Sequence, residues 1–127
     1  MALHTFEDLE VWKRASRLAV DVCSTVHALK ICGLKNQIER SAVSIPSNIA
    51  EGAERDSDGD FVRFLRISKG SCAELRTQLY ITAKLLDQIS EPPIRFMAEY
   101  IQETREISAM LQGLIFKIQR PTQESEN

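Results

Sequence analysis

Apolar side chains recur along this chain at intervals of three and four residues, a spacing that places them on one face of an α-helix. The first row predicts a helix over residues 12–29, and it consists of Trp12, Ala15, Ala19, Val22, Val26 and Leu29. Gly33 is expected to end that helix, because glycine readily adopts the left-handed conformation found at helix C-termini. A second row follows at Leu34, Ile38, Ala42, Ile45 and Ile49.

Two longer rows predict two further helices. The third row is Phe61, Phe64, Leu65, Ser68, Cys72, Leu75, Leu79 and Leu86, and the fourth is Ile94, Met97, Ile101, Ser108, Leu111, Ile115 and Ile118. Ser57, Asp58 or Asp60 is expected to cap the third helix by accepting hydrogen bonds from its free amides. Ser90 is expected to cap the fourth, with the two prolines that follow in its first turn.

No alternating pattern typical of strands separates these segments, and the short connections favour antiparallel neighbours. The predicted fold class is therefore all-α, an antiparallel up-down-up-down four-helix bundle. One domain is expected over residues 1–120. Residues 121–127 lack apolar anchors and are expected to form a disordered C-terminal tail.

Composition narrows the range of partners and compartments. The chain has 16 Lys and Arg against 18 Asp and Glu, so any surface that binds anions must be local. Cys23, Cys32 and Cys72 form no CxxC pair, which favours a reduced, cytoplasmic chain. The N-terminal residues do not resemble a signal peptide, and no apolar run approaches the roughly 20 residues of a membrane helix.

The residues that catalysis requires are not found at suitable spacings. Neither of the two histidines has a partner at metal-ligand spacing. A di-iron bundle would need a glutamate followed three residues later by histidine, whereas Glu51 is followed by Glu54 and Glu74 by Thr77. We therefore expect no catalytic residue, metal or cofactor. An enzyme is the least favoured class, and it would require a metal or ligand bound at the polar rows between Asn48 and Gln78.

Polar residues form a second row beside the apolar one on two of the helices. These rows are Gln37, Ser41, Ser44, Asn48, Glu51 and Arg55, and then Ser71, Glu74, Gln78 and Thr82. If the rows face each other, Asn48, Glu51, Glu74 and Gln78 are expected to form a hydrogen-bonded network partly inside the bundle. Such a network either fixes the helix register, because unpaired buried polar groups are costly, or binds a ligand or partner.

Pro46 and Gly52 interrupt the second helix. Proline lacks an amide hydrogen, so the carbonyl of Ala42 loses its usual partner and the helix is expected to bend. Gly52 is expected either to allow another backbone to come close or to ease the helix toward its end.

The third helix is locally basic. Residues 61–84 contain five basic residues and a single acidic one, Glu74. Arg63, Arg66, Lys69 and Arg76 are the candidates for contact with nucleic-acid phosphates, which would make binding strongly salt-dependent. The alternative is a solvated face that balances acidic residues on other helices.

Three segments of the chain resemble one known family. They read FEDLEVWKRASRLAVDV, QIERSAVSIPSNIAEGAER and FVRFLRISKGSCAELRTQL, and they resemble the four-helix-bundle proteins encoded in intervening sequences of bacterial 23S rRNA genes. The resemblance implies a homopentameric ring without established enzymatic activity. The matching motif positions are Gln37, Arg40, Ser44, Pro46, Asn48, Glu51, Gly52, Ser71, Glu74 and Gln78.

A related group, the accessory proteins of diversity-generating retroelements, is similar to the same family. In that group a basic surface works with a reverse transcriptase and nucleic acid, whereas the present chain is slightly acidic overall. Two interpretations follow from the sequence. One is a non-enzymatic oligomeric scaffold that associates with RNA, DNA or a nucleic-acid enzyme, and the other is a protein-interaction or assembly module that binds no nucleic acid.

Overall fold

The computed structural model describes residues 5–31 and 33–120 of the protein. Within them lie a short 3-10 turn, η1 (Phe6–Asp8), and the helices α1 (Glu10–Val26), α2 (Leu34–Ala53), α3 (Asp58–Gln88) and α4 (Met97–Gln119), with no strand. The predicted all-α fold with four helices is confirmed. The predicted C-terminal tail, residues 121–127, lies outside the described residues.

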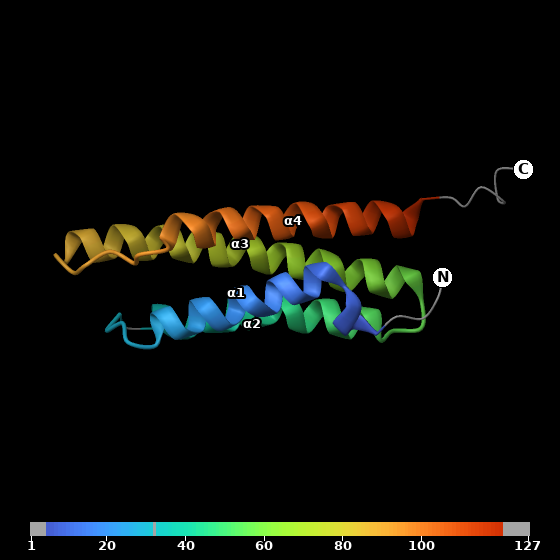
Figure 1. Ribbon diagram of the computed structural model, residues 1–127, viewed down its shortest axis with the longest axis horizontal. Helices are drawn as coiled ribbons and strands as arrows, with labels where there is room; N and C mark the ends of the chain where they lie inside the picture. The colour runs from blue at the N-terminus through green and yellow to red at the C-terminus, as the bar shows by residue number, and fades with distance from the viewer. Residues whose placement is uncertain (1–4, 32, 121–127) are drawn as a thin grey trace, which may run out of the picture.

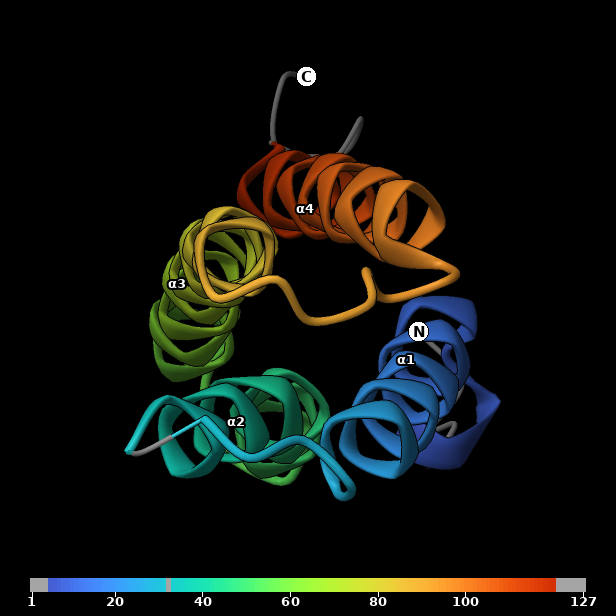
Figure 2. The ribbon, with the colours of Figure 1, turned by 90° about the vertical axis from the view of Figure 1, so that its left-hand side faces the viewer.

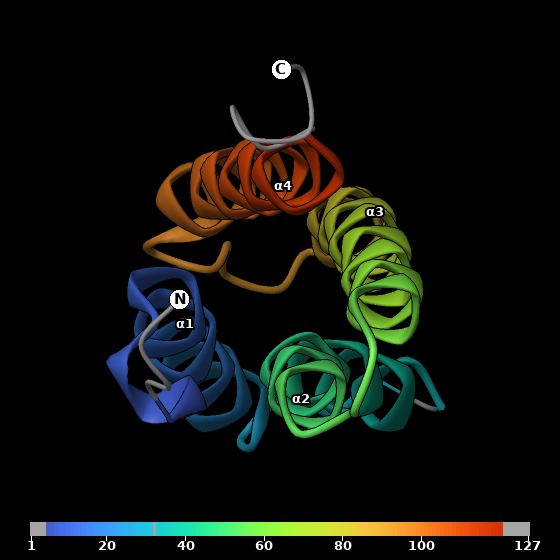
Figure 3. The ribbon, with the colours of Figure 1, turned by 90° about the vertical axis from the view of Figure 1, so that its right-hand side faces the viewer.

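The four helices lie side by side along one long axis (Figure 1). The α1–α2 and α3–α4 connections lie at one end, and the α2–α3 connection lies at the other. Viewed from either end, the helices surround a common centre in chain order, so that α4 is also a neighbour of α1 (Figures 2 and 3).

The predicted apolar rows meet in this centre. Every helix contributes side chains with no exposed surface, among them Val22 of α1, Ile38 of α2, Leu75 of α3 and Ile107 of α4. Burial of such side chains supplies the main stabilising free energy of a bundle. Among the described residues, no helix is both long enough and apolar enough to cross a membrane.

The helix ends differ from the sequence prediction at two of the connections. Ser57 caps α3 as predicted, its Oγ accepting a hydrogen bond of 3.1 Å from the amide of Asp60. The expected role of Gly33 is wrong, because α1 already ends at Val26 and Gly33 directly precedes α2 with a φ of 72°. The expected start of the fourth helix is also wrong, since Ser90 and both prolines lie before α4, which begins at Met97.

Ser90 instead ends α3 in a Schellman motif. Its φ is 58°, in the left-handed region, and its amide donates to the carbonyl of Asp87 at 3.2 Å. The amide of Glu91 donates to the carbonyl of Leu86 at 2.9 Å, which completes the paired bonds of the motif. Glycine usually occupies this position because a Cβ atom is strained there.

Ser90→Gly is therefore expected to stabilise the protein by about 0.5–1 kcal/mol, because glycine adopts a positive φ without strain. Thermal unfolding at fixed protein concentration measures the effect. The matched control is Ser47→Gly, at an exposed position inside α2, which is expected to destabilise by about 0.5–1 kcal/mol. Equal shifts in the same direction would contradict the strain at Ser90.

Candidate functional site

Hydroxyl groups join α2 to α3 along the polar rows. The Oγ atoms of Ser44 and Ser71 are 2.8 Å apart. Asn48 Nδ2 donates to the carbonyl and to the Oγ of Ser44, at 2.8 and 2.9 Å. One turn before Ser71, the buried Ser68 Oγ donates to the carbonyl of Ile45 at 2.8 Å. The two polar rows therefore face each other, and their short side chains make neutral hydrogen bonds.

The predicted inclusion of two glutamates in this network is wrong. Glu51 is 54% exposed, and its Oε1 accepts a hydrogen bond of 3.0 Å from Arg55, one turn along the same helix. Glu74 is exposed on α3. Both carboxylates thus keep contact with water, which avoids the large cost of burying a charge. Gln37 and Arg40, at the start of the α2 row, are exposed as well.

Gln78 is the one member of the α3 row with an unsatisfied group. The residue is half-buried, and its Oε1 is buried without a hydrogen-bond partner among the described residues. The neighbouring Thr82 satisfies its own hydroxyl by donating to the carbonyl of Gln78 at 2.8 Å. Gln78 thus lies beside the serine contact without joining it.

Gly52 and Pro46 are both buried in α2, which continues through the proline as a single helix. A Cβ atom added to Gly52 would lie 2.7 Å from Cβ of Phe64, 3.1 Å from the ring of Phe61 and 3.2 Å from the carbonyl oxygen of Phe61. The first distance is shorter than carbon contacts allow, and the other two are tighter than most contacts of a Cβ atom. Gly52 therefore lets the first turns of α3 approach the end of α2.

Three of the four candidate phosphate-binding residues lie along the contact between α3 and α4, and we call Arg66, Lys69 and Arg76 the basic row. Arg76 Nε donates to Thr104 Oγ1 at 3.0 Å, and Lys69 Nζ donates to Gln112 Oε1 at 2.5 Å. Arg66 lines a shallow hollow with Gln119 and the acidic Asp58. The basic row thus follows one seam of the bundle, with Lys69 and Arg76 held by hydrogen bonds and Arg66 exposed.

Arg63 lies apart from this row. Its guanidinium is 4.5 Å from the ring centroid of Phe64, which Arg55 of α2 approaches to 4.9 Å. Arg63 also pairs with Asp60 at 3.5 Å, one turn earlier in α3. The structure therefore places Arg63 toward α2, and the four candidates do not form one face.

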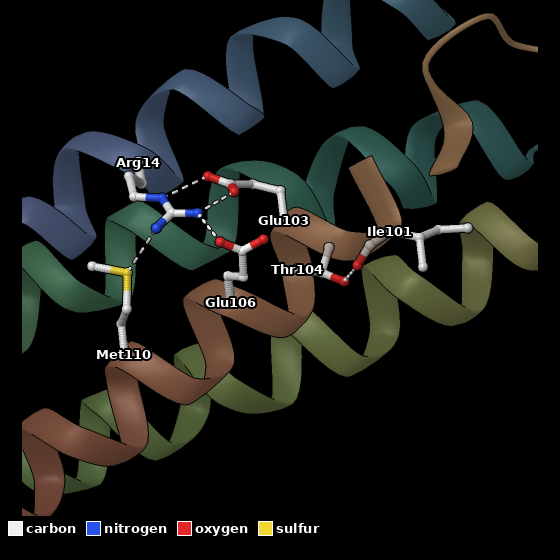
Figure 4. A network of polar contacts seen from close by, with 6 residues as sticks. All are labelled: Arg14, Ile101, Glu103, Thr104, Glu106 and Met110. Atoms are coloured by element: carbon white, nitrogen blue, oxygen red, sulfur yellow. Dashed lines mark hydrogen bonds and ion pairs between the residues drawn. The ribbon is translucent and has the colours of Figure 1, made fainter. Parts of the chain in front are cut away.

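A charged cluster between α1 and α4 was not predicted from the sequence. Arg14 of α1 points between Glu103 and Glu106 of α4, donating from Nε to Glu103 at 2.9 Å and from NH2 to both carboxylates (Figure 4). Its NH1 also lies 3.5 Å from the sulfur of Met110. These four residues form the Arg14 cluster. The only signal in the sequence is a basic residue beside apolar positions, among other basic residues such as Lys13 and Arg17, and it does not identify the partner helix.

The electrostatics of this cluster favour the charged forms. Hydrogen bonding to Glu103, and then to Glu106, raises the pKa of Arg14, and the hydrogen bond from Arg14 lowers the pKa of Glu106. Such charge-assisted bonds are stronger than neutral ones. All of the charged groups in the cluster are thereby used in holding α1 against α4.

Nucleophiles and metal ligands are not assembled in the described part of the chain. No three His, Cys, Asp or Glu side chains in residues 5–31 and 33–120 are grouped to hold a metal ion. Burial raises the pKa of the Cys72 thiol to about 12, so the reactive thiolate is scarce at neutral pH. Cys32 lies outside the described residues.

Comparison with known proteins agrees with the motifs. The family model described as 23S rRNA-intervening sequence protein matches residues 7–113. The chain belongs to this family. Among solved structures, it is similar to a protein of unknown function from the S23 ribosomal protein family of Bacteroides thetaiotaomicron, with 25% identity and a TM-score of 0.70. The match covers 83% of the present chain and 97% of the other. No curated protein matches the chain.

In this member of the 23S rRNA-intervening sequence family, the distinctive motif is used mainly for helix packing. Ser44 and Asn48 contact the serine of α3 or each other, and Gly52 admits the first turns of α3. The exposed motif residues Gln37, Arg40 and Glu51 remain accessible to a partner.

Proposed function

We propose that this protein is a non-enzymatic cytoplasmic scaffold whose antiparallel up-down-up-down bundle is the subunit of a homopentameric ring, and that it contacts nucleic acid. The observation that carries the nucleic-acid contact is the basic row of Arg66, Lys69 and Arg76 along the seam between α3 and α4. Such a row is complementary to a chain of phosphates, and a ring would repeat it around its circumference.

The use of the motif for packing supports a non-enzymatic role. The serines that a nucleophilic mechanism would require bond to each other or to backbone carbonyls. No general base lies among the contacts of Ser44, Ser68 or Ser71 within the described residues. Activation of a serine nucleophile requires such a base.

Exposed apolar side chains support self-association. Eight large ones are exposed on the described surface: Val20, Val43, Ile67, Tyr80, Ile81, Ile89, Phe96 and Phe116. They are distributed over all four helices and the α3–α4 connection, so that assembly into a ring would cover part of them. Native mass spectrometry tests this part of the proposal: a pentamer is expected, and a monomer at micromolar concentration would refute it.

The nucleic-acid contact is tested by filter binding to a structured RNA at 50 and 200 mM salt. Three phosphate contacts are expected to weaken binding roughly 10- to 100-fold between these concentrations. Arg66→Ala is expected to lower affinity more than the control Arg63→Ala, since Arg63 lies toward α2. Weak retention that does not depend on salt would instead support an assembly module without a nucleic-acid partner.

A further inference from the structure

Phe116 of α4 is the most exposed of the large apolar side chains in the described residues, with 66% of its surface accessible. A largely exposed aromatic ring on a helix gains little from its contact with water. Basic side chains of α3 and α4 lie near this ring.

The ring lies among basic groups on the α3–α4 seam. Phe116 follows Gln112 by one helical turn, and Gln112 accepts the hydrogen bond from Lys69. One turn further along α4, Gln119 lines a hollow with Arg66, and the exposed Arg120 ends the helix. Residues Gly113, Phe116 and Arg120 border a second hollow of about 590 Å³ beside it. An exposed aromatic face is therefore flanked by cations from both helices.

A second aromatic residue lies farther along the same seam. Tyr80 of α3 is 45% exposed, and its hydroxyl accepts a hydrogen bond of 2.7 Å from Arg105 of α4. Arg76 also reaches this seam, where its Nε donates to Thr104. Since Arg105 precedes Phe116 by eleven residues, the two aromatic positions are separated by about 16 Å along α4.

Few acidic side chains lie near this seam: Glu106, which follows Arg105, is bonded to Arg14 of α1, and Asp58 borders the hollow of Arg66 and Gln119. Residues 107–120 contain Lys117 and Arg120 and no Asp or Glu. The one acidic residue within 61–86 of α3 is Glu74, three residues after Ser71, whose hydroxyl contacts α2. Glu74 is therefore directed away from the α4 side, and the seam keeps a positive local charge in a chain whose net charge is −2.

We propose that the α3–α4 seam binds single-stranded nucleic acid, with bases stacking on Phe116 and Tyr80 and phosphates contacting the basic row together with Arg105 and Arg120. This inference rests on the proposed nucleic-acid contact and specifies its substrate. A single strand presents unpaired base faces that stack on aromatic rings without regard to sequence, whereas a duplex keeps these faces inside its stack.

The test is titration of a labelled 12-nucleotide oligo(U) and of a 12-base-pair RNA duplex by fluorescence anisotropy. Phe116→Ala is expected to weaken oligo(U) binding about 10-fold and duplex binding by less than about 2-fold, since stacking acts on unpaired bases. Phe116→Trp is expected to retain binding. Phe96→Ala is the matched control, because Phe96 is an exposed aromatic residue before α4 that stacks with Arg95 away from the basic row.

The outcomes separate this inference from the proposed function. Salt-dependent binding that is unchanged in Phe116→Ala, or equal loss for oligo(U) and duplex, overturns the stacking inference while the phosphate contact stands. Absence of salt-dependent binding to either probe overturns both. A change in the native mass of Phe116→Ala would show that the ring packs against a second copy, and it would also overturn the inference.

Discussion

Gly52→Ala is expected to destabilise the protein by about 1–3 kcal/mol, a large part of the stability of a domain of this size. The added methyl group would lie 2.7 Å from Cβ of Phe64 and 3.2 Å from the carbonyl oxygen of Phe61. Neither is the flexible end of a side chain, so α3 as a whole must move away from α2. This movement would also lengthen the contact between Ser44 and Ser71, which now measures 2.8 Å.

Urea unfolding at fixed protein concentration measures this loss. Gly70→Ala is the matched control: Gly70 is exposed in α3, and its added Cβ would meet nothing within 4 Å. Alanine inside an exposed helix is more favourable than glycine, so the control is expected to gain about 0.5–1 kcal/mol. A gain of similar size in Gly52→Ala would contradict the close approach of α2 and α3.

Arg14→Ala is expected to cost about 1–2 kcal/mol, because it removes the cation that holds Glu103 and Glu106. The Arg14 and Glu103 side chains are 25% and 26% exposed, so solvent screens part of the interaction. The two carboxylates of α4 would then repel each other, and α1 would lose its charged contact with α4. Arg17→Ala, one turn along α1 at an exposed position, is the control and is expected to change stability by less than about 0.5 kcal/mol.

The effect of Arg14→Ala is expected to depend on pH in one direction. Because Arg14 lowers the folded-state pKa of Glu106, its interaction stabilises the protein above the unfolded pKa of a glutamate, and this contribution is lost as pH falls through the lowered value. The difference in melting temperature between wild type and Arg14→Ala should therefore narrow as the pH falls below about 4. A difference that widens under these conditions would contradict the assignment.

The helices could be predicted from the sequence because burial of one helix face places apolar residues three and four positions apart. Their ends were less predictable. Ser90 has a side chain suited to capping a helix start, but its backbone adopts a left-handed conformation at the end of α3. This conformation depends on the hydrogen bonds that the amides of Ser90 and Glu91 donate to the last turn of α3. These bonds compete with the alternative in which a new helix begins at the two prolines.

The candidate site was predictable where residues are related by position within one helix, and less so where two helices must meet. The spacing predicts the two rows of polar positions, but it does not predict that they face each other or that Ser44 meets Ser71. The exposure of Glu51 and Glu74 depends on the rotation of each helix by a fraction of a turn, which the spacing leaves open. The Arg14 cluster joins residues 89 and 92 positions apart, and no local pattern relates them.

The hydroxyl contact between Ser44 and Ser71 carries no formal charge, whereas the Arg14 cluster consists of ions. Acid and high salt therefore act unequally on the two sides of the bundle. They weaken the Arg14 contact between α1 and α4, and they leave the neutral hydroxyl contacts of Ser44 with Ser71 and of Thr25 with Tyr100 unchanged. Ionic conditions are thus expected to change the contact between α1 and α4 more than the contact between α2 and α3, which also includes the close approach at Gly52.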